Sequence, residues 1–182
     1  MNLRHALDAP GFAPLPPRAR TLLETLAAPP RLGAHLRLVH DVAVTLTGWV
    51  GPRVDVPAVL FGAATHDIGK IVHPAELSGP GSAHELAGYS LLLSQGVEEP
   101  LARFARTHGS WDAADSTFED LLVTLADKVW KGKRLPELEK RVAERLGGPP
   151  WETFLALDDE LERIASGADA RLAFQAAYPT SG

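Results

Sequence analysis

The sequence predicts an all-α fold, because hydrophobic residues recur at helical spacing along most of the chain and alternating strand patterns are hard to find. Proline, glycine and capping residues divide the chain into about seven to eight helices. With 182 residues, of which 45% are hydrophobic, the chain is long enough to bury one good core. We therefore expect one domain over residues 1–182, built as a helical bundle.

The first part of the chain is expected to form a lead-in with one helix, followed by two longer helices. Residues 1–30 contain a proline-rich stretch and the segment "RARTLLETLAA", whose first helical turn suits Pro16-Pro17. The second helix is expected over residues 31–49 and the third over residues 57–69, with the turn-forming segment "GWVGPRVDVP" between them.

The remaining helices are also delimited by local signals. Ser82 and Glu85 have the spacing of a capping box, which predicts the start of a fourth helix. A core over residues 31–134 is thus expected, with C-terminal helices over residues 135–182. The expected positions are residues 82–95, 98–107 and 117–131, then "PELEKRVAERL", then an amphipathic segment over residues 151–178 that breaks near Gly167.

Composition excludes several classes of function. The chain has 18 Lys and Arg against 23 Asp and Glu, a formal net charge of -5, so we expect no general nucleic-acid binding. It has no cysteine, which excludes disulfides, thiolate metal sites and a cysteine nucleophile. The N-terminus lacks the apolar core of a signal peptide, and no segment reaches the ~18 apolar residues of a membrane span. We expect a soluble cytoplasmic protein, with a homodimer through the terminal helices possible.

Polar residues stand where the helical patterns ask for core residues. In "GAATHDIGKIVHP", His66 and Asp67 follow an apolar run. His35 lies on the inward-facing stripe of the second helix, whereas His40 lies roughly 140° away around that helix. Asp127 lies among apolar residues of the sixth helix, where an unpaired carboxylate would be costly, so it needs a cation.

Two further histidines lie at the ends of other helices. His84 opens the fourth helix and His108 closes the fifth, so the candidate ligands lie on or at the ends of different helices. Helical bundles build interior metal sites in this way. Four imidazoles with two carboxylates favour divalent transition metals (Fe, Mn, Co, Ni or Zn) over a pure magnesium site.

The order His35, His66-Asp67, Asp127, with "HDIGK" around the adjacent pair, resembles the HD-domain superfamily of metal-dependent phosphohydrolases. The resemblance covers about residues 31–134. His40 remains an alternative to His35 as the first ligand. The resemblance implies two metals bridged by Asp67, with His35, His66, Asp67 and Asp127 at one metal and Asp67, His84 and His108 at the other.

The resemblance implies hydrolysis of a phosphoester or phosphoanhydride in a nucleotide-like or other small phosphorylated substrate, through a hydroxide that bridges the metals. Lys70 lies one helical turn after Asp67 and is predicted to reach a substrate phosphate or the bridging carboxylate. Asp67 and Lys70 are therefore the predicted catalytic residues. Arg103, Arg106 and Trp111 are predicted to bind substrate, with surface ion pairs as the alternative for the arginines and core packing for the tryptophan.

Other interpretations stay open. Some HD-domain proteins use a similar set of histidines and aspartates to hold two irons and activate oxygen against a polyol or a phosphonate, and a shared fold does not fix the reaction. A metal-bound regulatory module without turnover is a third possibility. The basic residues after Asp127 also suggest phosphate binding, but for Lys133 and Arg134 we favour a solvated helix end, where cations interact favourably with the helix dipole.

Overall fold

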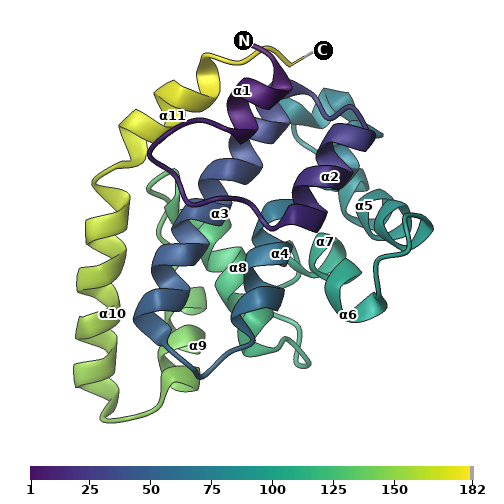
Figure 1. The fold of residues 1–182 in the computed structure, drawn as a ribbon. Coiled ribbons are helices and arrows are strands. Elements are labelled where there is room, and N and C mark those ends of the chain that lie inside the picture. Colours follow the sequence, from purple (N-terminus) through teal and green to yellow (C-terminus); the bar gives the residue numbers. More distant parts are fainter. Residues whose placement is uncertain (181–182) are drawn as a thin grey trace.

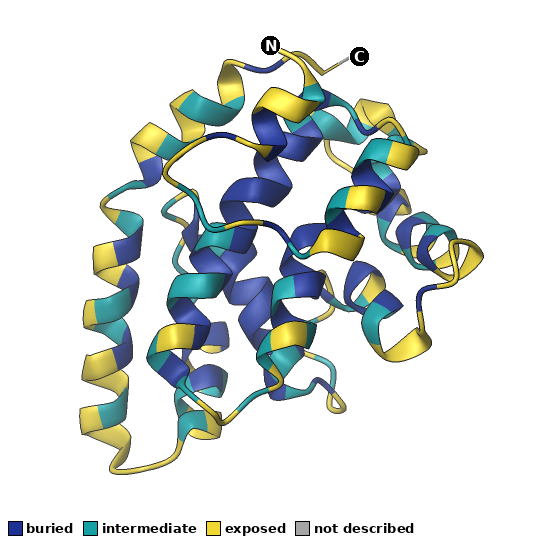
Figure 2. Cartoon of the chain, viewed as in Figure 1, coloured by how far each residue is buried: buried dark blue, intermediate teal, exposed yellow. Residues whose placement is uncertain are grey.

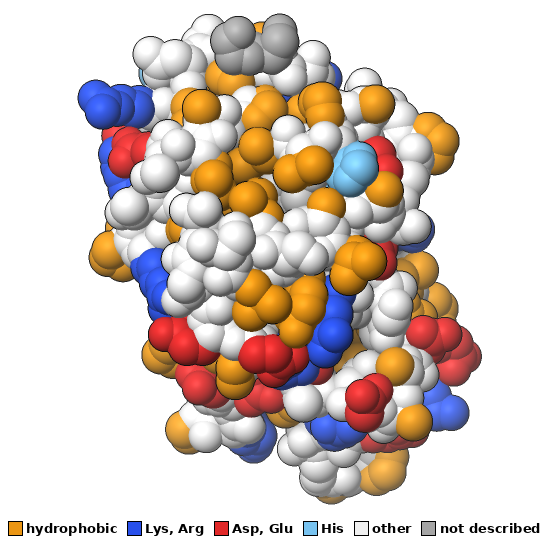
Figure 3. Space-filling model, turned by 90° about the vertical axis from the view of Figure 1, so that its right-hand side faces the viewer, with side chains coloured by type: hydrophobic (Ala, Val, Ile, Leu, Met, Phe, Trp, Pro, Cys, Tyr) orange, Lys and Arg blue, Asp and Glu red, His pale blue; other side chains and the backbone are white. Residues whose placement is uncertain are grey.

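A computed structural model describes residues 1–180, and this part of the chain is all-α, without a strand (Figure 1). The predicted fold class is therefore confirmed. Within residues 1–180, no helix combines the length and the apolar character needed to cross a membrane. Acidic and basic side chains lie beside hydrophobic ones over the lower half of the face drawn in Figure 3. The α-helices and 3-10 helices (η) are α1 (Leu3–Leu7), α2 (Pro17–Thr25), α3 (Pro30–Val50), α4 (Val56–Thr65), η1 (Ile68–Ile71), η2 (Pro74–Leu77), α5 (Ala83–Ser94), α6 (Glu99–Ala102), α7 (Phe104–Thr107), α8 (Phe118–Val129), α9 (Pro136–Leu146), α10 (Pro150–Ala165) and α11 (Ala168–Ala176).

Helix α3 is the central element of the bundle. It packs against α1, α4, α8 and α11. Its 21 residues begin with a proline in the first turn, where the missing N–H leaves no hydrogen bond unmade. Figure 2 shows long runs of buried residues on α3 and α8, the helices that carry the apolar positions of the core. These two helices form the centre of the hydrophobic core.

The hydrophobic core consists of two clusters that share α3 and α4. The larger cluster joins α3, α4 and α8 to α9 and α10, and includes Leu46, Leu122 and Leu161. The second joins the N-terminal half of α3 and the end of α4 to α2 and α5, and includes Leu23 and Leu92. Because α3 and α4 pack into both clusters, the polar side chains on these helices are anchored from two sides.

The structure has more helices than expected. The described residues contain eleven α-helices, against the predicted seven to eight, because α1 forms within the predicted lead-in and the fifth predicted helix is split into α6 and α7 at Arg103. The predicted break near Gly167 is present between α10 and α11. Pro17 occupies the first turn of α2, as predicted.

Two predictions of helix ends are wrong. The third predicted helix was expected to reach Gly69, but α4 ends at Thr65, and η1 follows a turn at Asp67. The predicted capping box at Ser82 is also absent, since that serine makes no capping hydrogen bond. The carboxylate of Glu76 replaces it, accepting hydrogen bonds from the backbone N–H groups of Ala83 and His84, each at 3.2 Å.

Candidate metal centre

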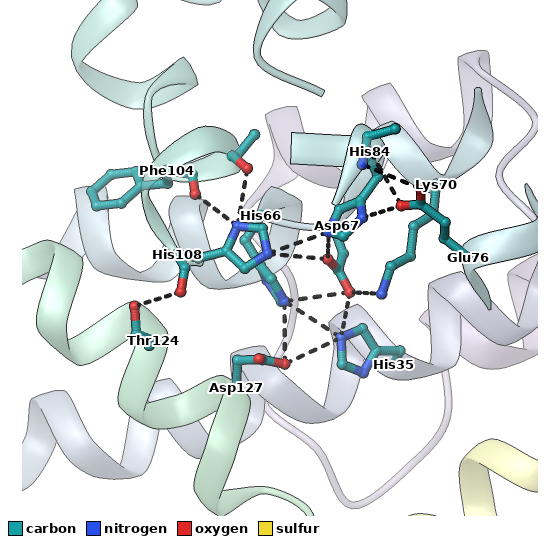
Figure 4. A network of polar contacts seen from close by, with 12 residues as sticks. His35, His66, Asp67, Lys70, Glu76, His84, Phe104, His108, Thr124 and Asp127 are labelled. Atoms are coloured by element: carbon teal, nitrogen blue, oxygen red, sulfur yellow. Dashed lines mark hydrogen bonds and ion pairs between the residues drawn. The ribbon is translucent and has the colours of Figure 1, made fainter. Parts of the chain in front are cut away.

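The structure brings six of the predicted site residues into one buried cluster (Figure 4). They come from α3, the end of α4, the turn before η1, the first turn of α5, the end of α7, and α8. All six side chains are at least nine-tenths buried, so each polar group needs a partner inside the fold. The residues are His35, His66, Asp67, His84, His108 and Asp127.

One trio of ligand atoms comes from His35, His66 and Asp127. The two Nε2 atoms lie 3.4 Å apart. Asp127 Oδ1 lies 3.6 Å from His35 Nε2 and 3.5 Å from His66 Nε2. Three donor atoms at these separations can surround one cation.

A second trio comes from Asp67, His84 and His108. Asp67 Oδ1 lies 3.0 Å from His84 Nε2 and 3.4 Å from His108 Nε2. The other carboxylate oxygen, Oδ2, lies 3.1 Å from His35 Nε2 and 3.7 Å from His66 Nε2. Each oxygen of Asp67 therefore faces a different trio, which is the geometry of a bridging ligand.

Hydrogen bonds to the outer nitrogens orient three of the four imidazole rings. His66 Nδ1 lies 3.0 Å from the carbonyl oxygen of Ala63, and His108 Nδ1 lies 2.9 Å from that of Ala105. A carbonyl oxygen only accepts, so each Nδ1 carries a proton, and Nε2 is the nitrogen left to bind a metal. The backbone thus fixes the ring tautomer that suits metal binding.

His84 is oriented by a carboxylate. Its Nδ1 donates to Glu76 Oε2 at 2.5 Å, and the same carboxylate caps the start of α5. This hydrogen bond lowers the pKa of Glu76. Burial acts to lower the pKa of His84, but the hydrogen bonds and charges of Asp67 and Glu76 outweigh burial and raise it. The negative surroundings that favour a proton on this ring favour a metal cation in the same way.

The outer side of the His35 ring is held by packing. Its ring meets Trp130 edge to face, with ring centroids 5.0 Å apart, and its buried Nδ1 has no hydrogen-bond partner within residues 1–180. His40 lies in neither trio. Both of its ring nitrogens are buried without a partner in the described chain, and burial lowers its pKa to about 4. The structure therefore brings His35, and not His40, to the other ligands.

A contact between two glycines brings the second trio together. A Cβ atom on Gly69 would lie 2.0 Å from the carbonyl oxygen of His84 and 2.5 Å from the backbone nitrogen of Gly88. Such distances are far below van der Waals contact, so η1 and α5 can approach this closely only without that side chain. The glycine in "HDIGK" thus lets Asp67 and His84 reach the same point.

The groups around both aspartates favour the ionised carboxylate. Burial acts to raise the pKa of Asp67, but the charge of His66 and hydrogen bonds from the other histidines hold it well below its usual range. Burial likewise opposes ionisation of Asp127, but His66 and Lys128 hold its pKa far below the usual value. Two carboxylates and four imidazole nitrogens, without a thiolate, fit a pair of divalent transition metals.

A cavity of about 240 Å³ opens beside the ligands and is lined by three lysines, Lys70, Lys128 and Lys131. Lys70 Nζ lies 2.5 Å from Asp67 Oδ2, and Lys128 Nζ lies 2.7 Å from Asp127 Oδ2. From the sequence, the roles of Lys128 and Lys131 stayed open. Glu76 was also missed, because no sequence motif links this residue to a histidine eight positions later.

The other predicted substrate-binding residues do not line this cavity. Arg103 binds the capping residues of α8, Asp120 and Thr117. Arg106 pairs with Glu99 at 3.2 Å and lies over the ring of Tyr89.

Trp111, the third predicted substrate-binding residue, packs against the larger hydrophobic cluster. Arg134, expected to be solvated, instead forms ion pairs with Glu139 and Asp158 at 2.8 and 2.5 Å.

The HD-domain family model matches residues 32–130, more than half of the chain. The match begins in α3, ends just after α8 and contains all six candidate ligands. No curated protein and no solved structure matches the chain. The extent of the family match, together with the ligands gathered in its interior, shows that this chain belongs to the HD-domain family.

Proposed function

We propose that the protein is a metal-dependent phosphohydrolase that cleaves a phosphoester or phosphoanhydride in a small, nucleotide-like or other phosphorylated compound. The observation that carries the proposal is the position of Asp67, whose two oxygens face separate trios of ligand atoms. When bound, two divalent cations would supply an activated hydroxide and neutralise charge that develops on a phosphoryl oxygen.

The charges around the cavity support an anionic substrate. In the protein alone, the ammonium groups of Lys70 and Lys128 balance the carboxylates of Asp67 and Asp127 that they contact. Divalent cations held by the ligands would make the same region strongly positive. A phosphate group entering the cavity would restore the balance, and burial would strengthen its interaction with the lysines.

Lys70 is the proposed catalytic lysine. Its side chain is about one-fifth exposed and already lies against the bridging carboxylate. From this position its ammonium group can donate hydrogen bonds to Asp67 and to a substrate phosphate at the same time, because it has three protons to donate. Lys70 would hold the phosphoryl group beside Asp67 and stabilise the charge that grows on it.

The test measures metal content and hydrolysis on the same preparation. Protein purified without chelator is analysed for metal per chain and then incubated with nucleotides, dinucleotides and generic phosphoesters, beside chelated protein and an oxygen-free sample. We expect close to two transition-metal ions per chain and phosphate release that needs metal but not oxygen. Two irons with oxygen consumption and no phosphate release would favour the oxygenase alternative, and a chain that binds no metal would contradict both.

A further inference from the structure

A second cavity lies next to the metal centre. It measures about 230 Å³ and shares His35, Lys70 and Lys131 with the lining of the cavity beside the ligands. Its wall includes Leu172 and Gln175 of α11, a helix outside the residues that match the HD-domain family. We name it the α11 cavity. The C-terminal helix thus adds a compartment beside the family's ligand cluster.

Helix α11 is fastened to the core at this point. Arg171 Nε donates to the carbonyl oxygen of Trp130 at 2.6 Å, just after the end of α8. The backbone N–H of Arg31, in the first turn of α3, donates to the carbonyl oxygen of Pro179 at 3.0 Å. Figure 1 shows α11 (yellow) running beside the N-terminal end of α3. The wall of the α11 cavity is therefore a fixed part of the fold.

The α11 cavity offers hydrogen-bond donors and positive charge. Lys70 and Lys131 line it, and so does Trp130. Gln175 adds an amide. None of its lining residues is an aspartate or a glutamate, whereas the cavity beside the ligands contains Asp67 and Asp127. The chemistry of the α11 cavity suits a group rich in acceptor oxygens and negative charge.

The sizes of the two cavities indicate a single ligand. Each is smaller than the ~300–1,000 Å³ of most small-molecule sites, and the shared residues His35, Lys70 and Lys131 lie at both. A compound with one group at the metals would extend its next group into the α11 cavity. Lys131 lines both cavities and forms no ion pair with the residues that the structure describes.

We infer that the α11 cavity binds a second anionic group of the substrate, a phosphate or a carboxylate, while the first phosphoryl group lies at the metal ligands. This inference rests on the proposed function. It narrows the substrate to a compound with two separated anionic groups, and it makes Gln175 a specificity-determining residue.

The experiment measures binding of non-hydrolysable probes to the metal-loaded protein by calorimetry. Propylphosphonate carries one anionic group, propane-1,3-diphosphonate carries a second phosphonate, and 4-phosphonobutanoate carries a carboxylate in its place. The variants are Gln175→Glu, which puts a negative charge into the α11 cavity, and Gln95→Glu, which adds the same charge at the exposed end of α5. Metal content is measured after each titration.

We expect at least one doubly anionic probe to bind the unmodified protein about tenfold more tightly than propylphosphonate does. Gln175→Glu should remove this advantage, since one like charge nearby costs on the order of a tenfold loss, and it should weaken the binding of propylphosphonate, which places no group in the α11 cavity, much less. Gln95→Glu should alter neither. The preferred probe identifies the second group as phosphate-like or carboxylate-like.

Two results would overturn the inference. One is equal binding of all three probes, and the other is an advantage that survives Gln175→Glu. Either result leaves the proposed hydrolase intact, because propylphosphonate would still bind at the metal centre. Failure of every probe to bind metal-loaded protein would instead count against the hydrolase itself, so the two failures are distinguishable.

Discussion

The two trios of ligands are built by different means. His35 and Asp127 project from the interiors of α3 and α8, the most deeply buried helices, and His66 continues α4. His84 and His108 lie at the ends of helices, and α7 is only four residues long. Helix packing and, at His66, one backbone carbonyl hold the first trio, while a carboxylate, backbone carbonyls and a glycine contact hold the second. We therefore expect the second trio to be the easier to disturb.

Asp67 contacts both trios, so its substitution should affect both metals alike and should have the largest effect of all. Because its oxygens face both trios, Asp67→Ala should abolish the binding of both metals and all phosphate release. Metal content per chain, measured beside the unmodified protein, tests this. Circular dichroism would check that the helices remain. Full metal content in this variant would refute the bridging role.

Substituting one histidine from the second trio should separate the two metals. His108→Ala leaves His35, His66 and Asp127 in place, so we expect one metal per chain to remain while hydrolysis falls below detection. His84→Ala should behave in the same way. Metal analysis with activity measured on the same sample tests both variants. If either variant lost all metal, the trios would not be independent sites.

Substitution of Lys70 tests whether this lysine acts on the substrate or only balances the charge of the carboxylate that it contacts. If its ammonium group stabilises the transition state, Lys70→Ala should lower kcat by ~100-fold with both metals retained. Lys140→Ala on α9, which lines neither cavity at the centre, serves as the control. An unchanged kcat would assign Lys70 to charge balance with Asp67 alone, and lost metal would make it a structural partner of that carboxylate.

The glycine contact tests whether the second trio depends on close packing. Gly69→Ala places a methyl group against the backbone of α5, which should cost about 1–3 kcal/mol of stability as an overpacked site and weaken the second metal most. Gly48→Ala is the matched control, because a Cβ there meets nothing within 4 Å. Thermal unfolding and metal titration of both variants provide the measurement. If the two variants had the same thermal stability and the same metal affinity, η1 would be free to move away from α5.

The difference between the two trios also explains how much of the site the sequence could predict. Helical spacing placed His35 on the buried face of its helix, and the apolar neighbours of Asp127 marked it as a carboxylate that needs a cation. The helices themselves followed from spacing and from proline and glycine signals. These features are local, since the apolar spacing within one helix is enough to predict a face that is buried.

The second trio and its supports depend on contacts between distant segments. His84 and His108 were candidates because they lie at the ends of other helices, and the resemblance to the HD-domain family assigned them to the second metal, but no local pattern predicts that their rings converge. A capping box was expected at Ser82, but Glu76 caps that helix and also holds His84. The α11 cavity is still less visible, because Gln175 meets the centre only through the packing of α11 on the core.

Substitution of Glu76 should have the smallest effect, and it tests whether the two trios are separate sites. Glu76→Gln keeps the shape of the side chain but replaces a charged acceptor of the His84 proton with a neutral one. Partners of this kind tune metal affinity by ~10–100-fold, and because the amide oxygen can still accept we expect a loss near tenfold, confined to the second metal. Titration of metal-free protein should then show one unchanged and one weakened site. Equal weakening of both would mean that Glu76 acts on the centre as a whole, and the separation of the trios would fail.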